Sequence, residues 1–266
     1  MIIFWIPATG WAFISWNCTD AATTFIFTIR KRIQPEQCRQ YPINIASPIA
    51  YVRERSMQFM ERYLEDTLDL GTDRMILAPG WGYVDAPDEE AFARSVEAIR
   101  RLAEKAAALG VKLSVEEMDP LSTLLVRDLP HLKKLLDAVG STQITACLDT
   151  FMAADNQETV EQYYEAFGQI GHVHFSGYGR EGYMVPGTGE LAALQQENAD
   201  GDATDVAPAD KQGAKTVLER QLESLAAHHY EGDLVLGLWG AGYFKDPDAA
   251  LRRSVQWVRE SSLISM

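Results

Sequence analysis

From Pro48 to the end of the chain, hydrophobic residues recur with two periods, one typical of helices and one typical of strands. Helical spacing predicts helices over 51–70, 88–109, 129–139, 158–167, 215–228 and 247–260. Short apolar runs between them predict strands at 74–78, 111–115, 143–148, 172–175 and 233–238. In the first helix, the apolar residues Met57, Met60, Leu64 and Leu68 recur at helical spacing. Strands that alternate with helices imply βα units and a parallel sheet.

Residues 1–34 do not follow this rhythm. Residues 1–29 contain a single charged residue, Asp20, and a cluster of basic residues comes after the apolar stretch rather than before it, unlike a secretory signal. A proline and a glycine interrupt the stretch, whereas a spanning helix needs about 20 apolar residues in a row. We expect strand-like segments near 2–6 and 23–29. One alternative is a membrane anchor. The other is that this stretch is not native sequence, as after a displaced start or a frame change.

The pattern predicts an α/β fold of the TIM type, a (β/α) barrel that is incomplete or irregular at its N-terminal end. Five strands follow residue 70, so an eight-stranded barrel would need three more from residues 1–45, where two full βα units do not fit. The length of 266 residues suits one such domain, over 35–266. Residues 196–212 are small and acidic without periodicity, which predicts a solvated insertion.

The composition of the chain narrows the classes of partner and the compartment that we expect. The chain has 24 Lys and Arg against 38 Asp and Glu, a net charge of −14, so general binding to nucleic acid is not expected. Cys18, Cys38 and Cys147 are an odd number without close spacing, which favours a reducing, cytoplasmic compartment over a disulfide scaffold. No pair of cysteines has the spacing of a thiolate zinc site.

Metal-ligand side chains stand at the ends of three consecutive predicted strands. Glu116 and Asp149 follow two strands, and His172 and His174 lie two residues apart on the next strand, on the same face. Carboxylates with an imidazole suit Mn²⁺, Mg²⁺, Co²⁺ or Zn²⁺ without strong selectivity. The alternatives remain open: Glu116 as a helix cap or a solvated residue, Asp149 as the cap of the next helix, and the histidines as one buried imidazole plus one ligand.

Other residues near these strand ends have two interpretations. Trp81 and Tyr83 either line a ligand pocket with their aromatic rings or pack in the core or rim. Glu117 and Asp119 lie beside Glu116 and are expected to be solvated loop acids, with a role as substitute proton carriers as the alternative.

Five segments carry a resemblance to a known family. They are PEQCRQYPINIAS (35–47), ALGVKLSVEE (108–117), CLDTF (147–151), GHVHFSGYGREGYMVPGTGEL (171–191) and the segment 230–251. In this order they resemble the sugar-phosphate isomerase/epimerase superfamily of xylose isomerase-like TIM barrels. Within it, the chain is most similar to the ketose 3-epimerases and the fructoselysine 3-epimerase type.

The resemblance implies a divalent ion held by Glu116, Asp149 and His174, with a fourth ligand from the last strand. It implies that Arg180 contacts oxygens or a phosphate of a sugar or sugar-phosphate substrate. His172 and Trp81 are further candidates on the substrate side, with a structural role for His172 as the alternative. In the implied reaction, one carboxylate removes a proton next to a ketose carbonyl to give an enediolate held by the ion, and a second carboxylate returns a proton on the opposite face, with Glu116 as one of the two. Related barrels often form dimers or tetramers, so a homo-oligomer is open.

Two departures from the family pattern bear on activity. The family's second glutamate falls at Gly237, and Thr150-Phe151-Met152 stands where a histidine often touches substrate. A degenerate relative that binds a sugar or a partner without catalysis is therefore the main alternative. An endonuclease IV-type enzyme would need more histidines than the five present, whereas a lyase acting on a cyclic polyol or keto acid would share the same metal chemistry.

Overall fold

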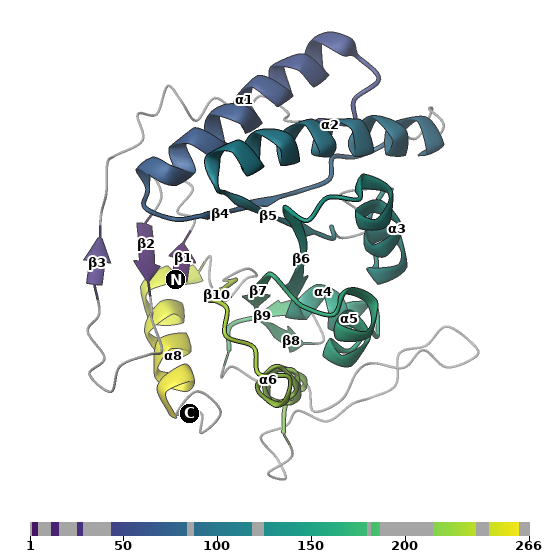
Figure 1. Cartoon of the computed structure of the whole chain (residues 1–266). Coiled ribbons are helices and arrows are strands. Elements are labelled where there is room, and N and C mark those ends of the chain that lie inside the picture. Colours follow the sequence, from purple (N-terminus) through teal and green to yellow (C-terminus); the bar gives the residue numbers. More distant parts are fainter. Residues whose placement is uncertain are drawn as a thin grey trace, which may run out of the picture. The chain divides into compact units, whose positions relative to one another are not determined.

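The computed structural model describes residues 2–4, 12–15, 26–28, 44–83, 88–118, 125–179, 182–186, 215–237 and 245–260. Figure 1 labels its elements along the chain. The strands are β1 (Ile2–Phe4), β2 (Ala12–Ser15), β3 (Ile26–Thr28), β4 (Arg74–Leu77), β5 (Lys112–Glu116), β6 (Ile144–Asp149), β7 (His172–Phe175), β8 (Gly177–Gly179), β9 (Gly182–Met184) and β10 (Leu234–Leu236). The helices are α1 (Ala50–Asp69), α2 (Asp88–Leu109), α3 (Leu129–Val139), α4 (Thr150–Asp155), α5 (Val160–Phe167), α6 (Val217–Ala227) and α8 (Pro247–Glu260).

The chain divides into two compact units. The central unit comprises Arg30–Leu148 and Tyr163–His172, and the terminal unit comprises Met1–Ile29, Asp149–Gln162 and Val173–Met266. The five strands and six helices expected from periodicity are all present, with ends shifted by a few residues, so the α/β prediction is confirmed.

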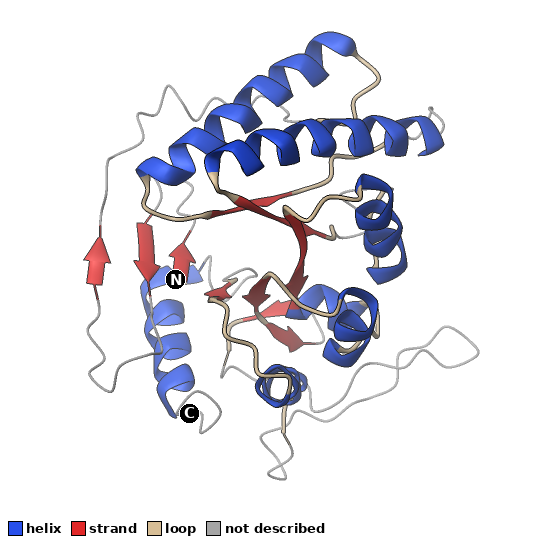
Figure 2. Cartoon of the chain, in the orientation of Figure 1, coloured by secondary structure: helices blue, strands red, loops and turns tan. Residues whose placement is uncertain are grey.

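In the central unit, β4, β5 and β6 pair side by side and in parallel. The backbone of Gly171, just before β7, donates to the carbonyl of Ala146 on β6 at 2.9 Å. Helix α1 packs against α2, and both lie against β4 and β5, as Figure 2 shows. This is the layered arrangement that βα units produce.

The buried face of α1 does not include every apolar residue that recurs at helical spacing. Of the apolar residues at helical spacing, Met57, Met60 and Leu64 are buried, whereas Leu68 is 43% exposed. The buried face continues at Thr67 instead, three residues after Leu64, because a period of 3.6 permits either step. The Thr67 hydroxyl is satisfied by donating to the Tyr63 carbonyl at 2.7 Å.

Helix ends follow the local chemistry of the sequence. Helix α3 spans the residues that periodicity predicts; it begins after Asp128, whose carboxylate accepts the backbone N–H of His131, and ends at Gly140 with φ of 64°. Helix α6 begins at a capping box formed by Thr216 and Glu219. These caps fix where each helix starts and stops relative to the strands.

In the terminal unit, β7 and β10 pair in parallel. The sequence pattern did not reveal helix α4 or the antiparallel hairpin β8–β9. The ring of Phe151 stacks on Tyr183 of the hairpin with centroids 3.7 Å apart, and Met152, Tyr178 and Val217 complete a small core. The hairpin is thus fixed to the helix that follows β6.

Strands expected near 2–6 and 23–29 are present as β1 and β3, in an antiparallel sheet with β2 rather than in the parallel one. Within the described part of the chain, no helix is long and apolar enough to cross a bilayer. The acidic segment 196–212 lies outside the described residues.

Candidate active site

The carboxyl end of β5 places Glu116 beside Cys147. Glu116 is the last residue of β5 and pairs in register with Cys147 of β6, so both side chains lie on the same face of the sheet. Their donor atoms lie within 4.8 Å of one another. Cys147 is fully buried and Glu116 is half-buried. The sequence placed no ligand at Cys147, although its position two residues before Asp149 on one strand gives both side chains the same face.

One step toward the amino ends of these strands, the same face remains polar. Ser114 pairs with Thr145, and their hydroxyls lie 3.1 Å apart. Arg74 of β4 donates to the Ser114 hydroxyl at 3.3 Å. The face that carries Glu116 is therefore lined by hydrogen-bonded polar groups rather than by apolar side chains.

Asp149 caps a helix, as one of the two interpretations predicted. It is the last residue of β6, and its Oδ1 accepts the backbone N–H groups of Phe151 and Met152 at 2.8 and 3.1 Å at the start of α4. Both bonds use the same oxygen, so the cap engages one oxygen of the carboxylate. The side chain is buried, with 5% exposure.

The two histidines of β7 differ in environment. His172 is 2% exposed and His174 is half-buried. This matches the interpretation of one buried imidazole and one that a ligand can reach. Arg180 lies outside the described residues.

Glu117 was expected in solvent, and this was wrong. Its side chain is 1% exposed, and the hydroxyl of Tyr163 on α5 donates to Glu117 Oε1 at 2.5 Å. The partner lies 46 residues away in the sequence, so no local pattern could indicate it. Asp119, the neighbouring acid, lies outside the described residues.

The end of β10 offers no carboxylate at position 237, because Gly237 stands there. The hydroxyl of Ser176 donates to the Gly237 carbonyl at 2.6 Å, and a Cβ at Gly237 would lie 2.5 Å from that hydroxyl oxygen. The backbone of Gly237 also donates to the Phe175 carbonyl at 2.9 Å. The space next to this position is therefore filled by the Ser176 hydroxyl.

Trp81 and Tyr83 follow β4, and both are half-buried. Asn44, for which the sequence pattern predicts no role, holds this segment. Its side chain makes two hydrogen bonds to the Trp81 backbone, at 2.9 and 3.1 Å, and is itself fully buried. A buried Asn between two isoleucines is the only local signal that the sequence offers for this role.

Comparison with known proteins decides the family. Residues 28–261 match the family described as the xylose isomerase-like TIM barrel. The chain belongs to this family. The TIM-type fold expected from the sequence is thereby confirmed, and the parallel strands with their helices fit an incomplete barrel.

Relatives of this xylose isomerase-like barrel include sugar epimerases. The L-ribulose 3-epimerase of Mesorhizobium japonicum is 29% identical over 155 residues, which are 57% of this chain and 52% of that protein. The chain thus spans about half the length of this curated relative. The D-psicose 3-epimerase of Clostridium cellulolyticum H10 has a TM-score of 0.62 at 18% identity, covering 84% of this chain and 75% of that one. The 3-keto-D-glucoside 4-epimerase of E. coli has a TM-score of 0.60 at 18% identity, covering 81% and 74%.

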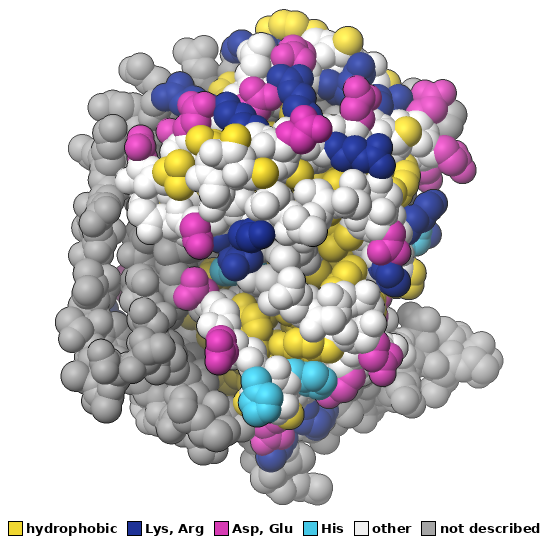
Figure 3. Space-filling view, in the orientation of Figure 1, with side chains coloured by type: hydrophobic (Ala, Val, Ile, Leu, Met, Phe, Trp, Pro, Cys, Tyr) yellow, Lys and Arg dark blue, Asp and Glu magenta, His cyan; other side chains and the backbone are white. Residues whose placement is uncertain are grey.

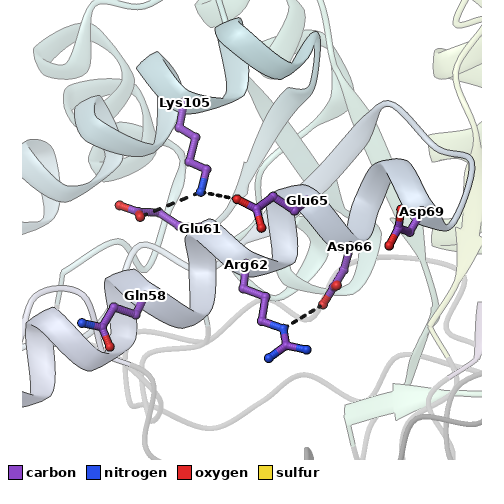
Figure 4. Close-up of a pocket in the computed structure, with 7 residues that line it drawn as sticks. All are labelled: Gln58, Glu61, Arg62, Glu65, Asp66, Asp69 and Lys105. Carbon is purple, nitrogen blue, oxygen red and sulfur yellow. Dashed lines mark hydrogen bonds and ion pairs between the residues drawn. The ribbon is translucent and has the colours of Figure 1, made fainter.

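The outer helices of the barrel carry a different kind of surface. Figure 3 shows acidic and basic side chains interspersed over α1 and α2. Figure 4 shows a groove there, lined by Gln58, Glu61, Arg62, Glu65, Asp66, Asp69 and Lys105. Lys105 pairs with Glu65 at 2.7 Å, and Arg101 nearby pairs with Glu61 at 2.6 Å. The groove is therefore lined by the side chains whose ion pairs join the two helices, and it does not include the residues at the carboxyl ends of the strands.

Proposed function

We propose that this chain is a divalent-metal-dependent isomerase or epimerase of sugars or sugar phosphates, with the ion held by Glu116, Asp149 and His174. The observation that carries the proposal is the position of these donors. Glu116 and Asp149 are the last residues of β5 and β6, and His174 lies on β7. In a TIM barrel the carboxyl ends of all strands open on the same face, which carries the chemistry.

The donor set fits such an ion. Two carboxylates and one imidazole are ligands that Mn²⁺, Mg²⁺, Co²⁺ and Zn²⁺ accept. Glu116 and His174 are half-buried rather than sealed in the core. The sulfur of Cys147 beside Glu116 favours Zn²⁺ or Co²⁺ over Mg²⁺, because thiolates are soft ligands.

The roles of the residues follow from their chemistry. A bound ion would polarise the ketose carbonyl and make the neighbouring C–H more acidic. Glu116 then takes that proton as the general base. Arg180 binds substrate oxygens or a phosphate, and the buried His172 supports the strand that carries His174.

The product depends on what returns the proton. One carboxylate that returns it to the neighbouring carbon on the same face gives an aldose–ketose isomer, whereas inversion at one carbon needs a second acid on the opposite face. Position 237 supplies no such group, so product identity tests what Gly237 does to the reaction.

A non-catalytic sugar-binding relative is the second candidate. The observation that favours it is again Gly237, which can neither coordinate an ion nor carry a proton. If the chain is such a relative, we expect weak ion binding and no sugar product that has taken up a proton from solvent.

The experiment incubates the protein with L-ribulose, D-psicose and D-tagatose in D₂O, with Mn²⁺ or Co²⁺ added, and follows deuterium incorporation and new sugars by NMR. Glu116→Gln is expected to abolish incorporation, while Glu97→Gln, an exposed residue of α2 with the same change of charge, leaves it intact. Phosphorylated ketoses in parallel tubes separate sugars from sugar phosphates. Wild-type protein that binds the ion only weakly and never exchanges a proton would refute catalysis and favour the second candidate, whereas tight ion binding would argue against that candidate.

A further inference from the structure

The turn of residues 44–47 is tied to the segment that follows β4. Asn44 Nδ2 donates to the Trp81 carbonyl at 2.9 Å, and Asn44 Oδ1 accepts the Trp81 N–H at 3.1 Å and the Ala46 N–H at 2.9 Å. One carboxamide thus satisfies both backbone groups of Trp81, as a neighbouring strand would. Asn44 itself is fully buried.

The two segments are closely packed against each other. Gly80 has φ of +85°, and a Cβ there would lie 2.8 Å from Asn44 Oδ1. On the other side of Gly80, the Ser95 hydroxyl donates to the Pro79 carbonyl at 2.6 Å. The Trp81 backbone is therefore held in one position by groups that cannot move independently.

We propose that Asn44 is a positioning residue that fixes the ring of Trp81 as one wall of the sugar site. The inference rests on the proposed function. Trp81 follows β4 at its carboxyl end, the edge at which barrels of this family build their sites. It is half-buried, so part of its surface remains available to a ligand. Indole rings offer a large, rigid apolar surface with one polar group, which suits the C–H face of an unmodified ketose.

The variant that isolates this role is Asn44→Ser. A serine hydroxyl can still accept the N–H two residues on, as Ser47 does from Ile49, so the turn at 44–46 is kept. The shorter side chain cannot reach Trp81. Ser95→Ala is the matched control, because it removes one buried hydrogen bond to the same segment without touching the Trp81 backbone.

Two measurements test the inference. The affinity for L-ribulose in the presence of Mn²⁺, from calorimetry, is expected to fall about three- to tenfold in Asn44→Ser and to stay unchanged in Ser95→Ala. Where turnover is measurable, KM is expected to rise with kcat unchanged, because the wall binds ground state and transition state alike. Acrylamide quenching, taken as the difference from Trp81→Phe, is expected to show a more accessible indole in Asn44→Ser only.

The Trp81→Ala background decides whether Asn44 acts through Trp81. There, Asn44→Ser is expected to have no further effect on affinity. A full effect in that background, or equal effects of Asn44→Ser and Ser95→Ala, would overturn the inference while leaving the proposed function intact. Wild-type protein that binds no ketose with Mn²⁺ would overturn both together.

Discussion

The contact between Ser176 and Gly237 gives a quantitative prediction. A methyl group at 237 would lie 2.5 Å from the Ser176 hydroxyl oxygen, well inside van der Waals contact. The backbones of both residues are held, because the Gly237 N–H donates to the Phe175 carbonyl and the Ser176 N–H donates to Thr150 Oγ1 at 2.9 Å. Gly237→Ala therefore forces the hydroxyl out of place and is expected to cost about 1–3 kcal/mol of unfolding free energy.

The same substitution is expected to be harmless once the hydroxyl is gone. Ser176→Ala alone loses one hydrogen bond, about 1 kcal/mol. In that background the nearest atoms to the new methyl are the Phe175 carbonyl at 3.7 Å and the Cβ of residue 176 at 3.9 Å, both ordinary contacts. Because φ at Gly237 lies outside the left-handed region, alanine there gains about 0.4–1 kcal/mol by restricting the unfolded chain.

The two sites are thus expected to couple by about 2 kcal/mol, with the double variant more stable than Gly237→Ala alone. Urea unfolding of wild type, both single variants and the double variant, followed by circular dichroism, measures this from the midpoints at constant slope. Costs that add within about 0.5 kcal/mol would refute the packing argument. The result also bears on placing a glutamate at position 237. Because a side chain there clashes with the Ser176 hydroxyl, such a variant is best made in the Ser176→Ala background.

Two further predictions concern stability. Gly80→Ala is expected to cost at least about 1 kcal/mol more than Gly110→Ala in urea unfolding, because both have positive φ but only a Cβ at Gly80 meets a neighbour, Asn44 Oδ1, whereas one at Gly110 meets nothing within 4 Å; equal costs would contradict this. The hydroxyl of Ser224 lowers the pKa of Glu161 below its ordinary 4.5, so the stability from this pair is fully present above that pH and is lost as the pH falls through the lowered value. The difference in unfolding midpoint between wild type and Ser224→Ala is therefore expected to shrink as the pH falls below 4.5, and a difference that grows on acidification would contradict the assignment.

Periodicity was sufficient for the parallel strands and their helices, because each buries a face that its own residues define. It was insufficient where a side chain is satisfied across the fold. Glu117 resembled a loop acid because its partner, Tyr163, lies on a helix that the sequence does not link to it. Asn44 was missed for the same reason, since its carboxamide serves a backbone 37 residues away.

Within the site, the sequence identified the residues at the strand ends but did not decide what each of them does. The pattern named Asp149 and offered two roles for it without choosing between them. The cap is confirmed by its bonds to Phe151 and Met152, and the role as a ligand stays a prediction. The hairpin β8–β9 was missed because its strands of three residues each are too short to show a period.

Because Asp149 caps a helix, the presence of this residue says little about whether the gene encodes an active enzyme. A carboxylate that caps the start of α4 stabilises the fold whether or not any sugar is turned over. A copy that had lost its chemistry would keep this aspartate for as long as it needed to fold. The survival of Asp149 is therefore a poor indicator of working catalysis, and Asp149→Ala would remove a helix cap together with the proposed ligand.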